Sequence, residues 1–296
     1  MDIKAIKNLK CGKVHENVSL KNYTTYKLNE KASCLIEVEK VKHLEKLLKY
    51  IKENNIKYKI IGNGSNLIFA QDFDGILIKL KDFNYLEIDD TKIKVGASYS
   101  LIKLCLKASN LGLTGLEFAA GIPATVGGAV YMNAGAYKSD MGYIVSEVDV
   151  LTPDFEHKTL YNHELNFHYR DSFFQHNSGY IILGCTIILK HGKKDDIISL
   201  IEDRKKRRLM TQPLEYPSAG SVFRNPTNDF AGRLIEEIGY KGKSIGDASV
   251  SLKHANFIIN KGNAKGSDIV TLIDEIKEKV KKKYDIDLKV EQEIVK

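Results

Sequence analysis

The sequence predicts an α+β fold, in which helices and strands are mixed without a regular alternation. The chain has 296 residues, of which 43% are hydrophobic and 28% charged, so it can form a globular protein of more than one domain. Helical and strand-like periodicities both occur along it. They do not alternate as strand–helix–strand units, which a parallel sheet covered by helices on both faces would require.

The first third of the chain contains one clear amphipathic helix among several strands. Apolar residues at 41, 44, 47, 48 and 51 form one stripe with lysines opposite, which predicts a helix over residues 41–54. Strands are predicted at 57–61 and 76–80, and a hairpin at 85–88 and 92–95. Ser100 is suited to cap a helix that runs through Asn110.

The remaining elements are predicted in the same way. Strands are expected at 145–151 and at 180–189, where the apolar run indicates burial on both faces. A helix at 195–210 ends in a basic run, and a helix at 229–238 is closed by Gly239. A strand at 255–259 precedes a long helix at 268–284, for which Ser267 is the expected cap. The chain ends in a strand-like segment at 288–295.

Composition limits the kind of protein. The net charge of +7 suits an anionic ligand without identifying one. No stretch approaches the roughly 20 apolar residues that cross a bilayer, and the N-terminus lacks the apolar core of a signal peptide. The four cysteines are scattered and form no Cys-x-x-Cys pair. We therefore predict a cytoplasmic protein that does not associate with membranes.

Two glycine-rich segments are candidate phosphate-binding loops. Gly62-Asn63-Gly64-Ser65-Asn66 follows a predicted strand, and consecutive backbone N–H groups in such a loop can surround an anion. The same pattern also forms ordinary tight turns. Residues 121–129 carry three glycines and one proline. Neither segment is a Rossmann fingerprint, because Leu67 stands at the third glycine position of the first.

Ser221 lies in the most informative segment, Pro217-Ser218-Ala219-Gly220-Ser221-Val222-Phe223-Arg224-Asn225-Pro226. Small residues let the backbone approach a ligand closely, and Arg224 can bind an anion with two N–H groups. Ser221 is therefore a candidate proton donor, nucleophile or phosphate contact, with a simple turn serine as the alternative.

Arg170 and Glu293 are charged candidates. Arg170 either forms a surface ion pair with Asp171 or faces a substrate carboxylate. Glu291 and Glu293 would share one face of a terminal strand, where solvent exposure is the ordinary explanation.

Two other patterns are set aside. His163 and His168 are five residues apart and do not share a helix face, so we predict no metal site. The basic run at 204–208 has no interleaved aromatic residues, so we predict a solvated helix face and no nucleic-acid partner.

In their order and spacing, six segments resemble those of the UDP-N-acetylenolpyruvoylglucosamine reductase (MurB) family. The resemblance runs from about Asn22 to Ile294 and is carried by residues 62–67, 121–129, 132–137, 169–172, 219–226 and 254–260. The short stretch between Arg170 and Ser221 is similar to that of the second, shorter type of the family.

The resemblance implies a FAD-binding fold of the vanillyl-alcohol-oxidase (PCMH) type with a C-terminal α+β substrate domain. The expected regions are FAD-binding subdomains at 1–80 and 81–198 and a substrate domain at 199–296. The implied reaction is NADPH-dependent, FAD-mediated reduction of UDP-N-acetylglucosamine enolpyruvate to UDP-N-acetylmuramate in peptidoglycan synthesis, by a monomer.

The resemblance also assigns roles to residues. Ser221 is the expected proton donor, Arg170 the group that stabilises the developing enolate, and Glu293 a second catalytic group. The expected cofactor contacts are Gly62, Asn63, Gly64, Ser65, Asn66, Gly121, Ile122, Pro123, Thr125, Gly127, Gly128, Asn133 and Gly135. The expected substrate contacts are Arg224, Asn225, Tyr137 and Asn256.

The chain departs from the family pattern in two places, and other functions stay open. Asn29-Glu30-Lys31-Ala32 stands where the family commonly has paired glycines, and Gln292 replaces the usual proline between two glutamates. The alternatives are a flavin oxidase of the same fold acting on an alcohol, a flavin- or nucleotide-binding module without turnover, and a basic interaction protein without a cofactor.

Overall fold

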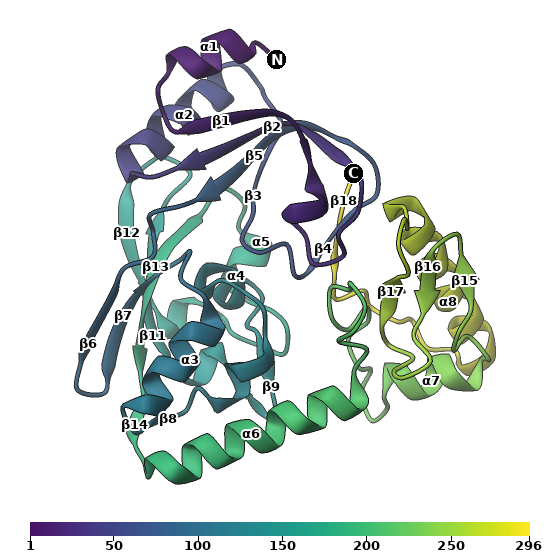
Figure 1. Ribbon diagram of the computed structural model, residues 1–296. Helices are drawn as coiled ribbons and strands as arrows, with labels where there is room; N and C mark the ends of the chain where they lie inside the picture. Colours follow the sequence, from purple (N-terminus) through teal and green to yellow (C-terminus); the bar gives the residue numbers. More distant parts are fainter. The chain divides into compact units, whose positions relative to one another are not determined.

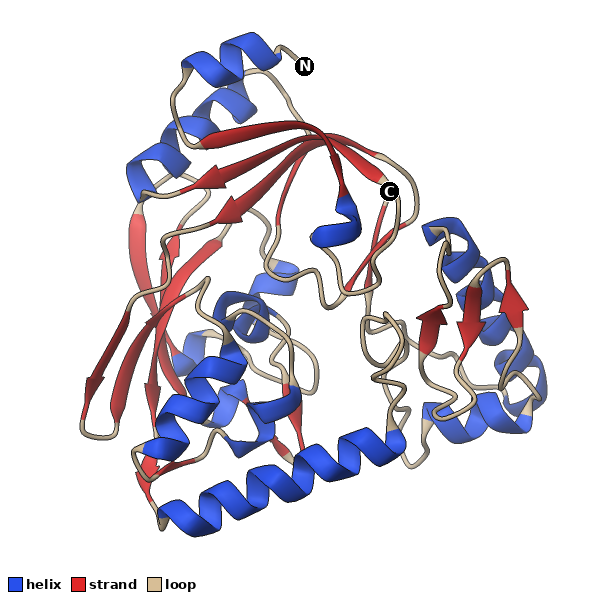
Figure 2. Cartoon of the chain, viewed as in Figure 1, coloured by secondary structure: helices blue, strands red, loops and turns tan.

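The computed structural model describes the whole chain, Met1–Lys296, and its backbone divides into two compact units. Unit 1 consists of Met1–Val14, Ile36–Gly62 and Leu77–Arg207, and unit 2 of His15–Leu35, Asn63–Ile76 and Arg208–Lys296. Both contain helices and strands in mixed order (Figures 1 and 2). The predicted α+β class is therefore confirmed.

Unit 1 is built on a five-stranded antiparallel sheet with the strand order β12-β11-β13-β7-β6. Its strands are β6 (Leu86–Asp89), β7 (Lys92–Gly96), β11 (Val145–Leu151), β12 (His157–Tyr161) and β13 (Ile181–Ile188). The central strand β13 is buried along nearly its whole length. This agrees with the apolar run in the sequence and confirms burial on both faces.

Helices and short pairings complete unit 1. The helices are α1 (Ile3–Asn8), α2 (Val41–Glu53), α3 (Leu101–Asn110), α4 (Val126–Tyr131), α5 (Phe173–His176) and α6 (Lys194–Thr211), whose last residues belong to unit 2. The short strands are β3 (Tyr58–Ile60), β8 (Leu113–Thr114), β9 (Gly135–Ala136), β10 (Ser139–Asp140) and β14 (Lys190–His191). Ser100 caps α3 as predicted, because its hydroxyl accepts a hydrogen bond from Lys103 N–H at 3.4 Å.

A four-stranded sheet with the order β1-β2-β5-β3 contains three strands that begin in one unit and end in the other. These three are β1 (Lys13–Ser19), β2 (Lys31–Val38) and β5 (Phe73–Leu80). The compact units are therefore interleaved along the sequence. The predicted division at residues 80 and 198 stays a prediction.

Unit 2 combines a small antiparallel sheet with a long helix. Its sheet has the order β15-β16-β17, formed by β15 (Ser244–Ile245), β16 (Ala248–Val250) and β17 (Ile258–Asn260), and α8 (Gly266–Tyr284) packs against it. A parallel pair joins β4 (Leu67–Phe69) to β18 (Glu293–Val295). The remaining helices of unit 2 are the short 3-10 helix η1 (Leu20–Asn22) and the α-helix α7 (Ala231–Glu237).

The core of unit 2 uses the stripe of α8 that the sequence predicts. Ile269, Leu272, Ile273, Ile276 and Val280 are all fully buried. Each such side chain contributes about 1.5–3 kcal/mol when it is removed from water. Burial of this face, more than helix propensity, therefore holds α8 in place.

Some boundaries differ from the prediction. Ser267 lies inside α8, and Lys265 is the N-cap residue, because the chain becomes helical two residues earlier than expected, where Gly266 packs directly on the backbone of Phe69. The strand expected at 255–259 is β17, shifted towards its C-terminal end. Of the expected strand at 288–295 only β18 is regular, although Val290 forms an isolated bridge with Phe223.

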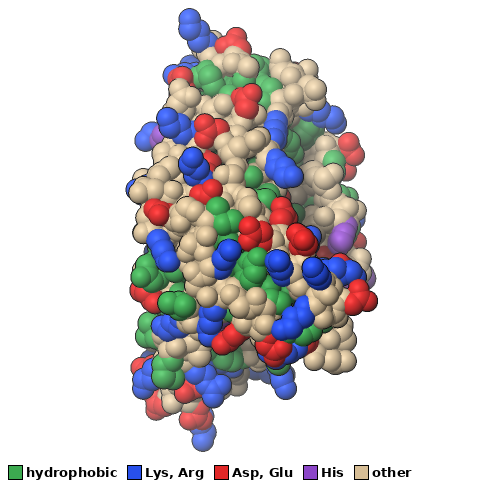
Figure 3. All heavy atoms as spheres, turned by 90° about the vertical axis from the view of Figure 1, so that its right-hand side faces the viewer, with side chains coloured by type: hydrophobic (Ala, Val, Ile, Leu, Met, Phe, Trp, Pro, Cys, Tyr) green, Lys and Arg blue, Asp and Glu red, His purple; other side chains and the backbone are tan.

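The surface carries both signs of charge. On the face shown in Figure 3, Lys and Arg side chains are interspersed with Asp and Glu. No helix is long and apolar enough to cross a membrane. No group of three or more His, Cys, Asp or Glu side chains is arranged to hold a metal ion.

Candidate active site

Arg170 lies at the tip of a tight turn in unit 1. The amide N–H of His168 donates to the carbonyl of Asp171 at 3.1 Å, and the N–H of Asp171 returns a bond to the carbonyl of His168 at 3.0 Å. Arg170 has a φ of +56°, in the left-handed region that residues other than glycine seldom occupy. Such a conformation costs of order 1–3 kcal/mol and persists where the surroundings enforce it, often at functional sites.

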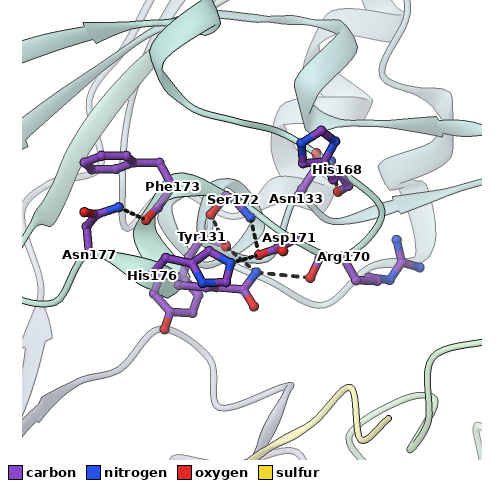
Figure 4. A network of polar contacts seen from close by, with 10 residues as sticks. Tyr131, Asn133, His168, Arg170, Asp171, Ser172, Phe173, His176 and Asn177 are labelled. Carbon is purple, nitrogen blue, oxygen red and sulfur yellow. Dashed lines mark hydrogen bonds and ion pairs between the residues drawn. The ribbon is translucent and has the colours of Figure 1, made fainter. Parts of the chain in front are cut away.

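The guanidinium of Arg170 is held by the backbone of β9. Its Nη2 donates to the carbonyl oxygen of Gly135 at 2.7 Å, and its charge lies 5.2 Å from the ring centre of Tyr169. The amide of Gln175 donates both to the carbonyl of Arg170 and to that of Tyr131, at 3.1 Å each. Figure 4 shows the guanidinium directed away from the surrounding polar network.

Buried polar groups fix the turn from behind. Asn133 is only 1% exposed; its Nδ2 donates to the carbonyl of His168 at 2.7 Å and its Oδ1 accepts from Gly142 N–H at 2.9 Å. The carboxylate of Asp171 accepts from Ser172 N–H at 2.9 Å and lies 2.8 Å from Nε2 of His176 (Figure 4). Asn133 is expected to contact the cofactor. Both polar atoms of its amide already form hydrogen bonds that position the Arg170 turn. Its predicted cofactor contact stays a prediction.

The glycine-rich segment at 121–129 packs tightly inside unit 1. The N–H groups of Val126 and Gly127 donate to the carbonyls of Tyr99 and Ala97 at 2.9 and 2.8 Å, and that of Gly128 to the Thr125 hydroxyl at 3.2 Å. These three amides are thus used within the protein. The N–H of Ile122 likewise donates to the carbonyl of Ala119 at 3.0 Å, and Pro123 has no N–H, so the phosphate contacts predicted for this segment stay predictions.

Gly62 approaches this segment closely, because a Cβ atom at Gly62 would lie 2.5 Å from the Thr125 hydroxyl oxygen. The absence of a side chain at Gly62 therefore brings two of the predicted cofactor loops together within unit 1.

The other half of the first glycine loop belongs to unit 2. Gly64 has a φ of +61°, and a Cβ there would lie 2.2 Å from the carbonyl oxygen of Tyr23. The carbonyl of Gly64 accepts a bond from Thr25 N–H at 3.3 Å, whereas the N–H groups of Gly64 and Ser65 make no hydrogen bond within the chain. These two consecutive donors suit an anion such as a dinucleotide pyrophosphate, so the loop fits the predicted cofactor.

Ser221 lies in a loop that is tied down on both sides in unit 2. Val222 N–H donates to the carbonyl of Asn256 at 2.9 Å, and the carbonyl of Val222 accepts from Glu291 N–H at 2.8 Å. The Asn256 amide binds the backbone of Phe223 twice, accepting from its N–H at 3.0 Å and donating to its carbonyl at 2.8 Å. The half-buried Ser221 is therefore presented on a rigid backbone.

Glu293 is brought to the glycine loop by the parallel pairing of β18 with β4. Its N–H donates to the carbonyl of Asn66 at 2.9 Å, and the Asn66 side chain donates to the carbonyl of Glu291 at 3.1 Å. Three predicted segments, around Asn66, Ser221 and Glu293, are thus joined by hydrogen bonds within unit 2. Only Glu293 of the two glutamates lies in a regular strand.

The predicted substrate contacts have defined positions. Asn256 is 4% exposed and its amide supports Phe223, as described. The side chain of Asn225 accepts from Ala231 N–H at 3.1 Å and so caps α7, and Arg224 N–H donates to the carbonyl of Lys289 at 2.9 Å. Tyr137 lies 4.7 Å under the guanidinium of Arg204 in unit 1. Contact of these four residues with substrate stays a prediction.

Tyr26 and Gln292 are functional candidates that the sequence interpretation missed. Both are buried, and the Tyr26 hydroxyl donates to Oε1 of Gln292 at 3.0 Å. The only signal in the sequence was the position of Gln292 between two glutamates. Nothing in the sequence linked it to Tyr26 or to the Ser221 loop.

The chain is similar to known proteins over nearly its whole length. The profile described as "FAD binding domain" matches residues 32–160, and the profile "UDP-N-acetylenolpyruvoylglucosamine reductase, C-terminal domain" matches residues 212–295. UDP-N-acetylenolpyruvoylglucosamine reductase of Anoxybacillus flavithermus is 43% identical over 96% of this chain and 95% of its own length. The enzyme of the same name from Bacillus subtilis is 40% identical over 99% of this chain and 97% of its own.

A solved structure is similar over the same length. The crystal structure of UDP-N-acetylenolpyruvylglucosamine reductase (MurB) from Thermus caldophilus has a TM-score of 0.82 and 35% identity, and the alignment covers 96% of this chain and 99% of that one. Fold and site therefore define an FAD-dependent oxidoreductase, as predicted. The chain belongs to the UDP-N-acetylenolpyruvoylglucosamine reductase (MurB) family.

Proposed function

We propose that this protein reduces UDP-N-acetylglucosamine enolpyruvate to UDP-N-acetylmuramate, with bound FAD as cofactor and NADPH as the reductant, in peptidoglycan precursor synthesis. Membership of the family over nearly the full chain supports the reaction class. The observation that carries the proposal for this chain is the hydrogen-bonded assembly of the Asn66 loop, the Ser221 loop and the Glu293 strand in unit 2.

The residues present fit FAD. The N–H groups of Gly64 and Ser65 are available to a pyrophosphate, and the missing side chain of Gly62 allows its loop to pack on Thr125. Bound FAD supplies the hydride that is added to C3 of the enolpyruvyl group.

Arg170 stabilises the charge that develops during reduction. Addition of hydride at C3 moves negative charge into the conjugated carboxylate, where a guanidinium can bind both oxygens. The Gly135 carbonyl, together with the turn that Asn133 supports, holds Arg170 in one orientation before substrate binds. A preorganised cation of this kind needs no rearrangement as the charge appears.

Ser221 delivers the proton to C2 in the proposed reaction. A serine hydroxyl is a weak acid, so it can act only on a strongly basic enolate that is held next to it. The bonds from Val222 to Asn256 and Glu291 provide the required rigidity. Glu293, fixed by its backbone bond to Asn66, serves as the second catalytic group.

We also propose that the protein works in the cytoplasm as a monomer without a nucleic-acid partner. The substrate and NADPH are small anions, for which the net charge of +7 is favourable. Sedimentation of the holoenzyme at several concentrations tests the oligomeric state, and a dimer would contradict this part of the proposal.

The reaction itself is tested by following the flavin absorbance near 450 nm. In the absence of oxygen, NADPH should bleach the purified holoenzyme, and the enolpyruvyl substrate should then restore the colour with formation of one UDP-N-acetylmuramate per flavin. Bleaching without reoxidation by substrate would indicate a flavoprotein of different specificity. A protein that contains no flavin would overturn the proposal.

A further inference from the structure

Gln292 makes an unusual set of contacts between two of the proposed catalytic residues. Its side chain is 3% exposed, and its Nε2 donates to the carbonyl oxygens of Ala219, Gly220 and Ser221 at 3.1, 3.0 and 3.3 Å. A primary amide has two N–H donors, so the three carbonyls share them. The backbone leading into Ser221 is therefore gathered around one buried amide nitrogen.

The Ser221 loop needs a donor at this place. Gly220 has a φ of +78°, and this bend turns three successive carbonyls towards the Gln292 amide. A buried acceptor without a partner costs about 1–3 kcal/mol, so the loop would change shape if the amide were removed. The position of the Ser221 hydroxyl therefore depends on the Gln292 side chain.

Tyr26 orients this amide. Its hydroxyl donates to Oε1 of Gln292 at 3.0 Å, which directs the nitrogen of the amide towards the three carbonyls. Tyr26 is fully buried, and burial raises the pKa of its hydroxyl far above the ordinary value, so the donor stays protonated. The carbonyl of Tyr26 in turn accepts a bond from the Asn260 side chain at 2.9 Å.

The residues on either side of Gln292 are fixed separately. Glu291 N–H binds the carbonyl of Val222 at 2.8 Å, and Glu293 N–H binds the carbonyl of Asn66 at 2.9 Å. The tripeptide 291–293 thus contacts three segments. Glu291 bonds the residue after Ser221, Gln292 bonds the residues that lead into it, and Glu293 bonds the glycine loop. A movement of Gln292 would therefore shift Ser221 relative to Glu293.

We propose that Gln292, oriented by Tyr26, is a positioning residue that sets the place of the Ser221 hydroxyl relative to Glu293 for protonation at C2. The inference rests on the proposed function. It assigns a role in catalysis to two buried side chains that do not themselves touch the reacting atoms.

The test separates the two half-reactions in the FAD-loaded enzyme. Gln292→Leu removes the amide, Gln292→Glu keeps an acceptor for Tyr26 and replaces the two N–H donors by at most one O–H, and Tyr26→Phe removes only the orienting hydroxyl. Ser249→Ala is the matched control, since Ser249 is 1% exposed and its hydroxyl bonds Ser244 and Val250 but neither Tyr26 nor Gln292.

We expect Gln292→Leu and Gln292→Glu to slow reoxidation of the flavin by substrate at least about tenfold, because proton transfer depends steeply on geometry. Tyr26→Phe should have a smaller effect in the same direction. Reduction by NADPH should stay within about twofold of the original rate. The solvent deuterium isotope effect on reoxidation should rise in the Gln292 variants, because protonation then limits the rate.

Ser249→Ala should lower the melting temperature at most, without a selective loss of reoxidation. The inference is overturned if Gln292→Leu or Tyr26→Phe reoxidises at the original rate, or if Ser249→Ala shows the same selective loss and isotope effect. Failure of the proposed function is distinguishable, because the unmodified enzyme itself would then not be reoxidised by the enolpyruvyl substrate.

Discussion

The guanidinium of Arg170 donates a hydrogen bond to the carbonyl oxygen of Gly135 at 2.7 Å, from a backbone in the left-handed region. Asp140 lies nearby, because its strand β10 pairs with Gly135. Burial raises the pKa of Asp140, although hydrogen bonds from Gly142 and Tyr143 and the charge of Arg170 lower it in part. Arg170 is therefore held in partly desolvated surroundings, where its interaction with a carboxylate is stronger than in water.

Replacement of Arg170 should affect substrate reduction more than stability. Asparagine tolerates a positive φ, so Arg170→Asn should fold, while reoxidation of the flavin by substrate should fall about 10²–10³-fold. Arg170→Lys keeps the charge but not the planar fork, so an intermediate rate is expected. Stopped-flow absorbance measures both rates. Arg233→Lys, on the exposed face of α7, is the control, and equal losses in the control would contradict the role of Arg170.

Ser221→Ala should separate reduction of the flavin from its reoxidation. NADPH should still bleach the variant within about twofold of the original rate, whereas reoxidation by substrate should slow by roughly 10²–10⁴-fold, the usual contribution of a positioned proton donor. Ser218→Ala, three residues earlier in the same loop, should change neither rate. Survival of both half-reactions in Ser221→Ala would exclude Ser221 as the proton donor.

Gly64→Ala should disturb the cofactor loop directly. The added Cβ would lie 2.2 Å from the carbonyl oxygen of Tyr23, and the φ of +61° is unfavourable for alanine. We expect a loss of stability of about 1–3 kcal/mol or more, together with a lower flavin content after purification. Thermal melting and the ratio of absorbance at 450 and 280 nm measure these effects.

Gly232→Ala provides the matched control for Gly64→Ala. Gly232 lies in α7, and a Cβ there would lie 3.4 Å from the nearest atom, on His254. Alanine in a helix is favoured over glycine by roughly 0.5–1 kcal/mol, so this variant should melt at the same or a higher temperature. A Gly64→Ala protein with normal flavin content would contradict the proposed role of the Gly64–Ser65 loop in binding the cofactor.

His254 should make stability depend on pH. Burial lowers the pKa of His254 below its ordinary value of 6.5, and its Nδ1 accepts a hydrogen bond from Asn256 N–H at 3.2 Å. The folded protein therefore binds this proton less readily than the unfolded chain does. The free energy of unfolding should be fully retained above about pH 6.5 and fall as the pH drops towards the folded pKa.

His254→Gln should flatten this part of the stability profile, as measured by urea unfolding at a series of pH values. His191→Gln is the control, because His191 is exposed in β14 and its ring lies 2.8 Å from Asp90. An unchanged slope in His254→Gln would show that other groups cause the acid sensitivity.

The elements whose pattern is local could be predicted from the sequence. Strand β11 and helix α3 have the predicted bounds, α2 is one residue shorter than predicted, and α6 is one residue longer at each end. The apolar stripe of a helix and the apolar run of a buried strand each lie within one segment, so they can be recognised without knowledge of the rest of the chain. The order and spacing of the glycine, arginine and serine segments indicated the family for the same reason, since they can be compared along the sequence.

The contacts that support the candidate site could not be predicted from the sequence, because they join segments that are far apart along the chain. Tyr26 and Gln292 are separated by 266 positions, and the Gln292 amide reaches a loop some 70 positions away. Likewise, no local pattern predicts that Asn133 supports the Arg170 turn. Nor does one predict that the Gly135 carbonyl accepts a hydrogen bond from the Arg170 guanidinium. Hydrogen bonds of this kind depend on where the folded backbone places each donor and acceptor, so they are fixed only when distant segments pack together.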